Sequence, residues 1–374
     1  MRLRTPSAKG WLRAVRIAYF INSMEGGGAQ SPLPLIVNAL EKAGAEVRVF
    51  ALTRRNGKAI ARLREQGVEP VIREGGESDH LAALGWMKEQ ARQWRADAIW
   101  TSLTRATLLG QVAGAQLGAP VVSWQHNAFL KPWNERLLKW RASASAFWVA
   151  DSAQVAELTR ERMGVAPEDL VTWPIFAADR EALQSQAWQQ GQVLRLGSLG
   201  RLHPAKGYDI LLDALALLRL RGFEPATPFR IEIAGSGSDE AALQRKAKEL
   251  RLESVEFAGF ADDPATFLAS LHLYLQPSRR EGFCIAAHEA MQAGLPVIVS
   301  RTGEMPFTVD NTAYGRTFAV GDVVGLADAL ADLLSRPDEL HSMGIALRER
   351  VRERFSQERF EATGAECVER LRSL

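Results

Sequence analysis

Short apolar segments alternate with longer segments of helical spacing along the first half of the chain. The apolar runs at residues 16–22, 46–52, 98–102 and 120–125 have the length and composition of buried strands. Between them, residues 34–44, 58–66 and 81–95 place apolar side chains three and four positions apart, which predicts helices. This alternation predicts βαβ units and a parallel sheet that is covered on both faces.

The alternation weakens and then starts again in the second half of the chain. Pro167, Pro174 and the Gln-rich residues 184–192 interrupt it. A second series of predicted strands follows, at residues 193–199, 229–234, 255–258, 272–276 and 296–300. We therefore expect an α/β fold of two doubly wound domains, residues 1–180 and 181–356, with a cleft at the carboxyl ends of their strands. A last helix, residues 357–374, would cross back to the first domain.

Composition agrees with two soluble domains. The chain has 374 residues, of which 47% are hydrophobic and 24% charged, and this length exceeds what one hydrophobic core usually supports. Its two cysteines, Cys284 and Cys367, are too few for a disulfide framework, which favours the cytoplasm. The N-terminal residues imitate a signal peptide, but Arg16 interrupts the apolar run, so we expect a basic extension before the first strand.

The charge is unevenly distributed, although the formal net charge is only +2. Residues 1–64 contain 12 Lys or Arg but 3 Asp or Glu, whereas residues 191–374 contain 22 and 26. An excess of positive charge at the N-terminus fits an anionic partner such as a phospholipid, a lipid-linked acceptor or an acidic glycan. Exposed arginines that keep this region soluble are the alternative, and both interpretations stay open.

A strand-to-helix segment, PSRREGFCIAAHEAM at residues 277–291, carries two carboxylates eight positions apart. Glu281 lies just before the turn at Gly282, and Glu289 lies about 10–12 Å further along the predicted helix. The glycine allows a ligand to approach the backbone, and free N–H groups in the first helical turn suit a phosphate. Two carboxylates so far apart suit the two hydroxyl-bearing ends of a ligand with a diphosphate in its middle.

The whole segment, through GLPVIVS at residues 294–300, resembles the E-x7-E signature of retaining glycosyltransferases with the GT-B fold, most closely family 4. The resemblance implies two facing Rossmann-like domains, of which the first binds the acceptor and the second the nucleotide sugar. It implies that Glu281 binds the donor sugar and Glu289 the ribose. It also implies that Gly282, Phe283 and Cys284 offer backbone N–H groups to sugar and phosphate.

A second motif, GRLHPAKG at residues 200–207, follows a predicted strand and is similar to the segment whose Arg and Lys clamp the diphosphate in this family. The roles fall on Arg201 and Lys206, and cations there would stabilise the charge that grows on the leaving phosphate. The turn at Gly235 resembles the family's G-x-G turn. Phe260 resembles the position that meets the nucleobase, with a core or gating phenylalanine as the alternative.

The first domain carries the acceptor side of the resemblance. The family has a glycine-rich loop beside the donor phosphates and the acceptor, which corresponds to Gly27 and Gly28 in MEGGGAQ. Gln30 and the residues after it replace the usual Glu-Arg. His126, at the end of a predicted strand, takes the place of a histidine that reaches the donor sugar. Residues 131–148 mix tryptophans with basic residues, which fits a membrane surface, a glycan acceptor or core packing.

The sequence contains no Asp-x-Asp and no His or Cys cluster of metal-ligand spacing, so we expect neither a metal nor a cofactor, with the nucleotide sugar as substrate. The expected reaction is retaining transfer of a hexose-type sugar from a UDP- or GDP-linked donor to a glycan or lipid-linked acceptor. Bacterial cell-envelope polysaccharide or lipopolysaccharide synthesis is the expected setting, in the cytoplasm with peripheral contact at the inner face of the membrane.

Two other functions stay open: a nucleotide-sugar epimerase on the same fold, and a non-catalytic relative that binds nucleotide sugar. Nucleic-acid binding is not expected, because only the basic N-terminal region fits it and no recognition motif accompanies that region.

Overall fold

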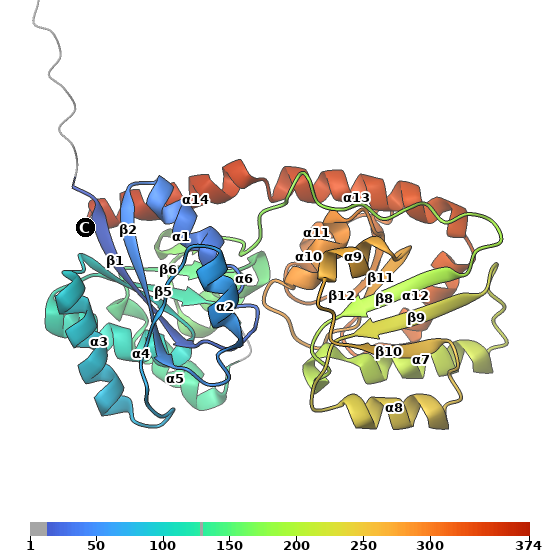
Figure 1. The fold of residues 1–374 in the computed structure, drawn as a ribbon, viewed down its shortest axis with the longest axis horizontal. Coiled ribbons are helices and arrows are strands. Elements are labelled where there is room, and N and C mark those ends of the chain that lie inside the picture. Colours follow the sequence, from blue (N-terminus) through green and yellow to red (C-terminus); the bar gives the residue numbers. More distant parts are fainter. Residues whose placement is uncertain (1–12, 128–129) are drawn as a thin grey trace, which may run out of the picture. The chain divides into compact units, whose positions relative to one another are not determined.

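The computed structural model describes residues 13–127 and 130–374, which form two sheets covered by helices (Figure 1). In their order across the first sheet, the strands are β3 (Val71–Ile72), β2 (Ala45–Thr53), β1 (Val15–Ser23), β4 (Ala98–Ser102), β5 (Val121–Gln125), β6 (Phe147–Ala150) and β7 (Leu170–Thr172). Those of the second sheet are β10 (Val255–Gly259), β9 (Phe229–Ala234), β8 (Leu194–Leu199), β11 (Leu273–Gln276), β12 (Val297–Ser300) and β13 (Gly315–Phe318).

Helices connect most of these strands. In the first half they are α1 (Leu33–Lys42), α2 (Lys58–Glu65), α3 (His80–Trp94), α4 (Thr104–Leu117), α5 (Pro132–Trp140) and α6 (Ala153–Met163). In the second half they are α7 (Tyr208–Leu220), α8 (Glu240–Glu249), α9 (Pro264–Ala269), α10 (Ile285–Gln292), α11 (Met305–Thr308), α12 (Val323–Leu334), α13 (Leu340–Arg354) and α14 (Gln357–Arg372).

Both sheets run outward in the same way from a central pair of strands. In the first sheet, β2 and β3 follow β1 on one side, and β4 then pairs with β1 on its other side. In the second sheet, β9 and β10 follow β8 on one side, and β11 pairs with β8 on its other side. The central pairs β1–β4 and β8–β11 are parallel. Such a reversal is the place where doubly wound sheets bind ligands, at the carboxyl ends of the strands. The predicted α/β class with two doubly wound halves is confirmed.

The predicted strands and helices named above are all present, with their ends shifted by two residues at most. The weaker region after residue 125 is not irregular, however. It contains α5, β6, α6 and β7, which extend the first sheet. The short 3₁₀ turn Pro167–Asp169 lies between α6 and β7, so Pro167 ends a helical connection without ending the sheet.

By the density of their contacts the described residues divide into two compact units. The first holds the residues up to Ser123 with Ser143–Phe147 and Thr363–Leu374, and the second holds Trp124–Ala142 and Trp148–Ala362. The ends of β5 and β6, with α5, α6 and β7, therefore belong to the second unit. The last helix is shared: its C-terminal part lies in the first unit, where the Arg372 guanidinium donates to the carbonyl oxygens of Ala43 (3.1 Å) and Gly44 (3.3 Å).

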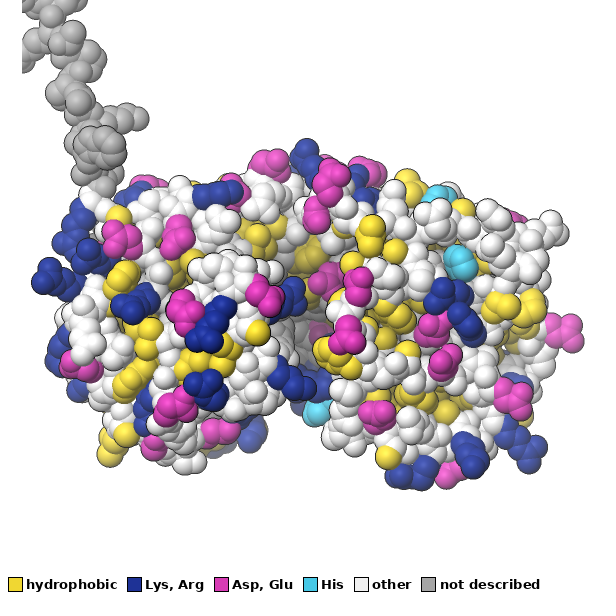
Figure 2. Space-filling model, viewed as in Figure 1, with side chains coloured by type: hydrophobic (Ala, Val, Ile, Leu, Met, Phe, Trp, Pro, Cys, Tyr) yellow, Lys and Arg dark blue, Asp and Glu magenta, His cyan; other side chains and the backbone are white. Residues whose placement is uncertain are grey.

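Much of the positive charge near the N-terminus is paired. At least five of the basic residues between 13 and 64 form ion pairs with carboxylates, several of which lie beyond residue 64. The pairs are Arg13–Asp97, Arg16–Glu46, Arg54–Glu74, Arg55–Glu25, Arg55–Glu77 and Arg64–Glu69. On the face drawn in Figure 2, Lys and Arg side chains are interspersed with Asp and Glu side chains and form no continuous basic surface. The predicted basic extension at residues 1–12 lies outside the described residues.

The aromatic and basic stretch at residues 131–148 divides into two kinds of tryptophan. Trp148 on β6 is 1% exposed and belongs to the core, whereas Trp133 and Trp140 on α5 are 66% and 75% exposed. Core packing therefore accounts for Trp148 alone. No helix among the described residues is long and apolar enough to cross a membrane.

Candidate active site

The two predicted donor motifs meet through an ion pair. Lys206 ends a short 3₁₀ turn after β8, and its Nζ donates to Oε1 of Glu281 at 2.7 Å. The two side chains are only 22% and 9% exposed. Burial lowers the pKa of Lys206, but Glu281, through its charge and its hydrogen bond and together with the neighbouring Cys284 and Tyr208, outweighs this effect, so the pKa lies above its ordinary value. Lys206 is therefore a fixed cation at physiological pH.

Backbone contacts hold the two motifs together. The carbonyl oxygen of Ala205 accepts hydrogen bonds from the N–H groups of Arg279 (2.7 Å) and Arg280 (3.3 Å). Gly207 has φ +67°, and a Cβ at this position would overlap the carbonyl oxygen of Pro277. A side chain there would push the lysine turn away from the turn that carries the glutamate, so the geometry requires glycine.

A chain of buried polar groups positions the Glu281 carboxylate. Ser278 donates to Oε1 of Glu281 at 2.5 Å and accepts from Gln276, which in turn accepts from the Tyr274 hydroxyl at 2.7 Å. Tyr274, Gln276 and Ser278 are each 0% exposed. These partners fix one oxygen of the carboxylate against Lys206 and limit its rotation.

The turn after Glu281 presents consecutive backbone donors. Among the described residues, none accepts a hydrogen bond from the N–H of Gly282, Phe283 or Cys284. Cys284 has φ +75° and caps the start of α10, where helix geometry adds positive potential. The Phe283 side chain is 2% exposed and stacks on His288, with ring centroids 4.1 Å apart. The buried ring anchors a turn whose N–H groups suit an anion.

Cys284 and Glu289 complete this segment. Burial raises the pKa of the Cys284 thiol, so the thiol is protonated at physiological pH and is a poor nucleophile. Glu289 is half-buried and lies on α10, the helix that begins at this turn. The predicted order of carboxylate, backbone donors and second carboxylate is thus carried by one continuous segment.

His126 follows β5 and is held by a residue that the sequence did not identify. Its Nδ1 lies 2.9 Å from Oδ1 of Asp151, which comes directly after β6, and its side chain is 5% exposed. Trp124 also donates to Asp151, at 2.5 Å, and its indole stacks on the His126 ring. A carboxylate at Nδ1 favours the tautomer that carries its hydrogen on this nitrogen and fixes the orientation of the ring.

Within the second unit, His126 lies beside the Glu281 turn. The Ser152 hydroxyl donates to the carbonyl oxygen of Gly282 at 2.8 Å. A Cβ on Gly282 would overlap the carbonyl oxygen of His126, so this glycine permits close packing of the two segments. The structure thus brings together His126, Lys206, Glu281 and the N–H groups of Gly282, Phe283 and Cys284.

Arg201, Gly235 and Phe260 lie at the carboxyl ends of the neighbouring strands β8, β9 and β10. Gly235 has φ +141°, and its N–H donates to Gly259 at 2.6 Å. Arg201 is exposed and makes no ion pair with any other residue that the structure describes. Phe260 is 71% exposed, which contradicts the alternative of a core phenylalanine and leaves its side chain open to solvent.

The glycine-rich loop lies in the first unit. The Gly27 carbonyl oxygen accepts from the N–H groups of Gln30 (3.1 Å) and Ser31 (3.0 Å), which forms a turn before α1. Gln30 is buried and its side chain donates to the carbonyl oxygen of Ser23 at 2.9 Å. Nothing lies within 4 Å of a Cβ placed on Gly28, so no contact within the described chain demands glycine there.

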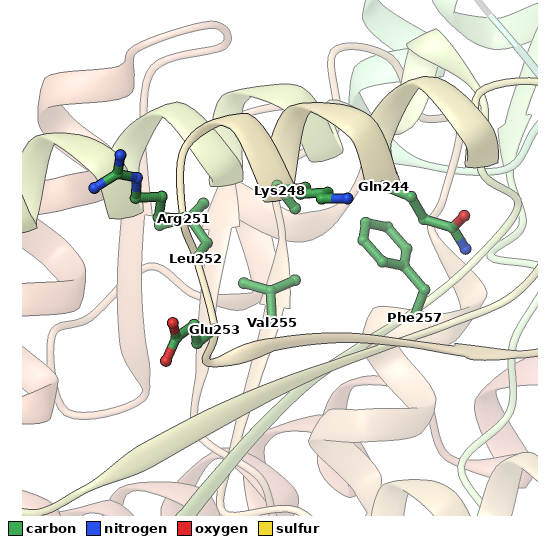
Figure 3. A pocket seen from close by; sticks show the side chains of 8 residues that line it. Gln244, Lys248, Arg251, Leu252, Glu253, Val255 and Phe257 are labelled. Carbon is green, nitrogen blue, oxygen red and sulfur yellow. The ribbon is translucent and has the colours of Figure 1, made fainter.

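A pocket of about 370 Å³ lies away from these residues, between α8 and β10 (Figure 3). It is lined by Gln244, Ala247, Lys248, Arg251, Leu252, Glu253, Val255 and Phe257. None of the predicted site residues lines it. No group of three or more His, Cys, Asp or Glu side chains that could hold a metal ion occurs in the part of the chain that the structure describes.

Two family models match the chain, one in each half. Residues 26–176 match "Glycosyltransferase Family 4" and residues 180–350 match "Glycosyl transferases group 1". Among curated proteins, a phosphatidyl-myo-inositol mannosyltransferase of Mycobacterium leprae is 28% identical over 92% of this chain and 89% of its own length. The N-acetyl-alpha-D-glucosaminyl L-malate synthase of Bacillus anthracis is 35% identical over 35% of this chain and 34% of its own length. Several curated relatives, the Bacillus anthracis protein among them, are matched over less than half of their own length.

Solved structures share the fold. The structure of Anabaena HepE in complex with UDP and glucose superposes with a TM-score of 0.81 at 19% identity, covering 96% of this chain and 100% of that one. The two sheets of this chain repeat one strand order, and each half of the chain matches a glycosyltransferase family model. The chain belongs to the GT-B glycosyltransferases of family 4.

Proposed function

We propose that this chain is a retaining glycosyltransferase that moves a hexose-type sugar from a UDP- or GDP-linked donor to a glycan or lipid-linked acceptor. The observation that carries the proposal is the Lys206–Glu281 pair beside three backbone N–H groups that have no acceptor among the residues that the structure describes. A cation and N–H donors suit a diphosphate, and a carboxylate suits sugar hydroxyls. A nucleotide sugar offers these groups in sequence.

The residues divide the donor between them. Glu281 binds the sugar hydroxyls and Glu289 the ribose, while Arg201, Lys206 and the N–H groups of the turn bind the diphosphate. Gly235 gives the backbone close access, and the exposed ring of Phe260 packs on the nucleobase. His126, whose ring Asp151 orients, contacts the donor sugar. Gly27 and Gly28 lie beside the donor phosphates and the acceptor in this proposal, on the resemblance alone.

The mechanism follows from where charge develops. As the glycosidic bond breaks, its electron pair goes to the leaving phosphate oxygen, and the sugar becomes oxocarbenium-like. Lys206, Arg201 and the N–H groups stabilise the phosphate more in this transition state than in the bound donor. The acceptor hydroxyl attacks from the same face, forms the new bond and passes its proton to a phosphate oxygen. Retention and independence of metal are part of the proposal.

The proposed setting is bacterial cell-envelope polysaccharide or lipopolysaccharide synthesis, in the cytoplasm with peripheral contact at the inner face of the membrane. A mannosyltransferase named for phosphatidyl-myo-inositol and relatives named for GDP-mannose support a lipid-linked acceptor and a nucleotide-diphosphate donor.

The test begins with thermal stabilisation by a panel of UDP- and GDP-sugars, because a ligand that binds only the folded state raises its melting temperature. The stabilising donor is then incubated with a panel of lipid-linked and glycan acceptors, and the anomeric configuration of the product is read by NMR. We expect a retained configuration and turnover that a chelator leaves unchanged.

Other outcomes identify the competing functions. Conversion of the donor to an isomeric nucleotide sugar without acceptor would show an epimerase. Donor binding with neither transfer nor slow donor hydrolysis would show a non-catalytic relative. An inverted product, or a strict requirement for a divalent ion, would contradict the proposed mechanism while leaving the transferase class in place.

A further inference from the structure

Helix α5 exposes two large indole rings. Trp133 is 66% and Trp140 is 75% exposed. Other tryptophans, such as Trp100 and Trp124, are among the largest fully buried side chains. Leaving an indole in water forgoes the favourable burial of an aromatic side chain. Two exposed indoles on one nine-residue helix point to an interaction surface.

The two indoles share one face of the helix with Arg136, and a second cation, Lys139, borders this face. Trp133 and Trp140 are seven positions apart, which places them about 20° apart around the helix and about 10 Å along it. Arg136 and Lys139 are exposed. At about 100° per residue, Arg136 lies about 40–60° from the two indoles, whereas Lys139 lies about 100–120° from them, at the border of this face. We call Trp133, Arg136, Lys139 and Trp140 the α5 face. It carries two positive charges and no carboxylate.

The rest of α5 is committed to the protein. Leu138 is fully buried on the opposite side of the helix. Glu135, the acidic residue of the helix, is directed to Arg162 of α6, with an N···O distance of 3.9 Å. The Arg141 guanidinium lies over the Trp140 ring, 5.8 Å from its centroid, which adds a third cation at the edge of the face. Packing thus fixes which side of α5 is presented to solvent.

We propose that the α5 face binds the anionic lipid surface of a membrane. Indole rings are amphipathic and settle at the level of lipid headgroups, where their N–H groups stay hydrated. Lys and Arg beside them are attracted to anionic lipids. A neutral glycan could stack on indoles, but it gives no reason for the cations beside them. Charge complementarity therefore favours anionic lipid as the partner.

This surface differs from the basic N-terminal region that the sequence suggested. Five basic residues of that region are paired with carboxylates, whereas Arg136 and Lys139 have no ion pair with another described residue. Lipid binding at the α5 face deepens the peripheral membrane contact of the proposed setting and rests on it, whereas the proposed sugar transfer depends on the donor site and is tested separately.

The test measures binding of the whole chain to vesicles by co-sedimentation, without nucleotide sugar. Phosphatidylglycerol–phosphatidylcholine vesicles are compared with pure phosphatidylcholine. We expect binding to the anionic vesicles only, weakened by salt. Arg136→Gln with Lys139→Gln should weaken binding about 30-fold, since each cation near an anionic surface contributes about a fivefold factor in affinity. Trp133→Ser with Trp140→Ser should weaken it at least tenfold, in line with the loss of two interfacial aromatic anchors.

Matched controls separate the face from general charge and hydrophobicity. Lys248→Gln with Arg251→Gln removes two exposed cations beside the pocket of Figure 3. Leu81→Ser with Leu220→Ser removes two side chains that are 87% and 84% exposed. Each control should bind vesicles within twofold of the unmodified chain. Circular dichroism and melting temperatures verify that all variants fold.

A direct readout places the indoles. Quenching of tryptophan fluorescence by brominated phosphatidylglycerol should be strong for the unmodified chain and largely lost in Trp133→Phe with Trp140→Phe. Equal binding of the α5 variants and the unmodified chain would overturn the proposal. So would equal binding to neutral vesicles, or binding of a soluble glycan through the α5 face in place of lipid.

Discussion

Single residues at the site compete for the same charges. The Lys206 ammonium group donates a hydrogen bond to the Glu281 carboxylate. A diphosphate that binds Lys206 therefore competes with Glu281 for this cation. Arg201, by contrast, is exposed and has no ion-pair partner in the described chain. The sequence motif predicts both cations but not this difference, because it depends on the turn that joins Ala205 to Arg279 and Arg280.

Removing Lys206 should reduce turnover strongly. Lys206→Ala and Arg201→Ala should each lower kcat by about 10²–10³, the usual loss when one group that stabilises transition-state charge is deleted. Steady-state transfer assays at saturating donor measure this. Lys246→Ala is the control, because Lys246 also forms a lysine–carboxylate pair, with Asp213 at 2.7 Å, but outside the site. A Lys206 variant with turnover near that of the control would refute the diphosphate role.

The two glutamates should separate in binding experiments. Glu289→Ala should weaken the binding of free nucleoside diphosphate about tenfold, the loss of a hydrogen bond to a charged group. Glu281→Ala should leave it equal or tighter, because its proposed partner is the sugar and its removal frees Lys206 from an ion pair. Isothermal titration calorimetry with UDP and GDP distinguishes the two. The reverse ranking would be incompatible with a sugar end at Glu281.

Whole elements show what the sequence pattern can and cannot predict. The longer strands were predicted because their apolar runs are continuous and buried on both faces, as in β4, where all five residues are buried. Strand β6 was missed because its four residues continue an aromatic and basic stretch. With β6 unrecognised, Asp151 at its end could not be placed beside His126. Strands β3 and β7, of two and three residues, are too short for any periodicity.

Gly207 should be irreplaceable at the turn before α7. Gly207→Ala should destabilise the fold by about 2–3 kcal/mol, from the left-handed backbone and the overlap with Pro277, and should weaken donor binding. Gly222 provides the comparison, because its φ is +66° but nothing lies within 4 Å of a Cβ there. Gly222→Ala should therefore lose only about 1–2 kcal/mol, the cost of the left-handed backbone. Denaturant unfolding measures both, and equal losses would contradict the proposed overlap.

Helix α10 should make stability depend on pH through His288. Its ring nitrogens lie 2.9 Å from the Cys284 carbonyl oxygen and 3.1 Å from the Thr308 hydroxyl, and burial lowers its pKa from 6.5 to about 3. Between these values the folded ring is neutral and the unfolded ring takes up a proton. Acid therefore favours unfolding, and stability is lost as pH falls from about 6.5 towards 3.

The measurement is the free energy of unfolding between pH 7 and 4.5 for the unmodified chain and His288→Gln. The difference between their slopes should approach about 1.4 kcal/mol per pH unit in the lower half of this range, which corresponds to one proton. Parallel curves would show that His288 takes up no proton on unfolding.

At the scale of the whole molecule, two doubly wound sheets were predictable because each half repeats strand, helix and strand. The division of the chain into two compact units could not be predicted, because each unit combines segments that are distant in sequence. Deleting residues 363–374 should destabilise the first unit, because Cys367 and Val368 are fully buried and Leu371 is 7% exposed. Burying two or three such side chains contributes roughly 1.5–3 kcal/mol each.

Thermal unfolding that is monitored by hydrogen exchange of backbone amides tests whether the truncation destabilises the first unit. The truncated chain should lose protection in β1 and β2 before β8 and β9, whereas deletion of the exposed Leu374 alone should change nothing. Uniform loss of protection across both sheets would contradict a local contribution of the last helix.

The shared last helix also sets an order for synthesis. The first unit has most of its residues by Ser123, yet its segment Thr363–Leu374 is translated some 240 residues later. At roughly 5–20 residues per second, that gap lasts roughly ten seconds to a minute on the ribosome. Throughout it, the apolar surface that α14 covers has no covering helix. The nascent first half is therefore a natural client for chaperones, and its maturation waits for the end of translation.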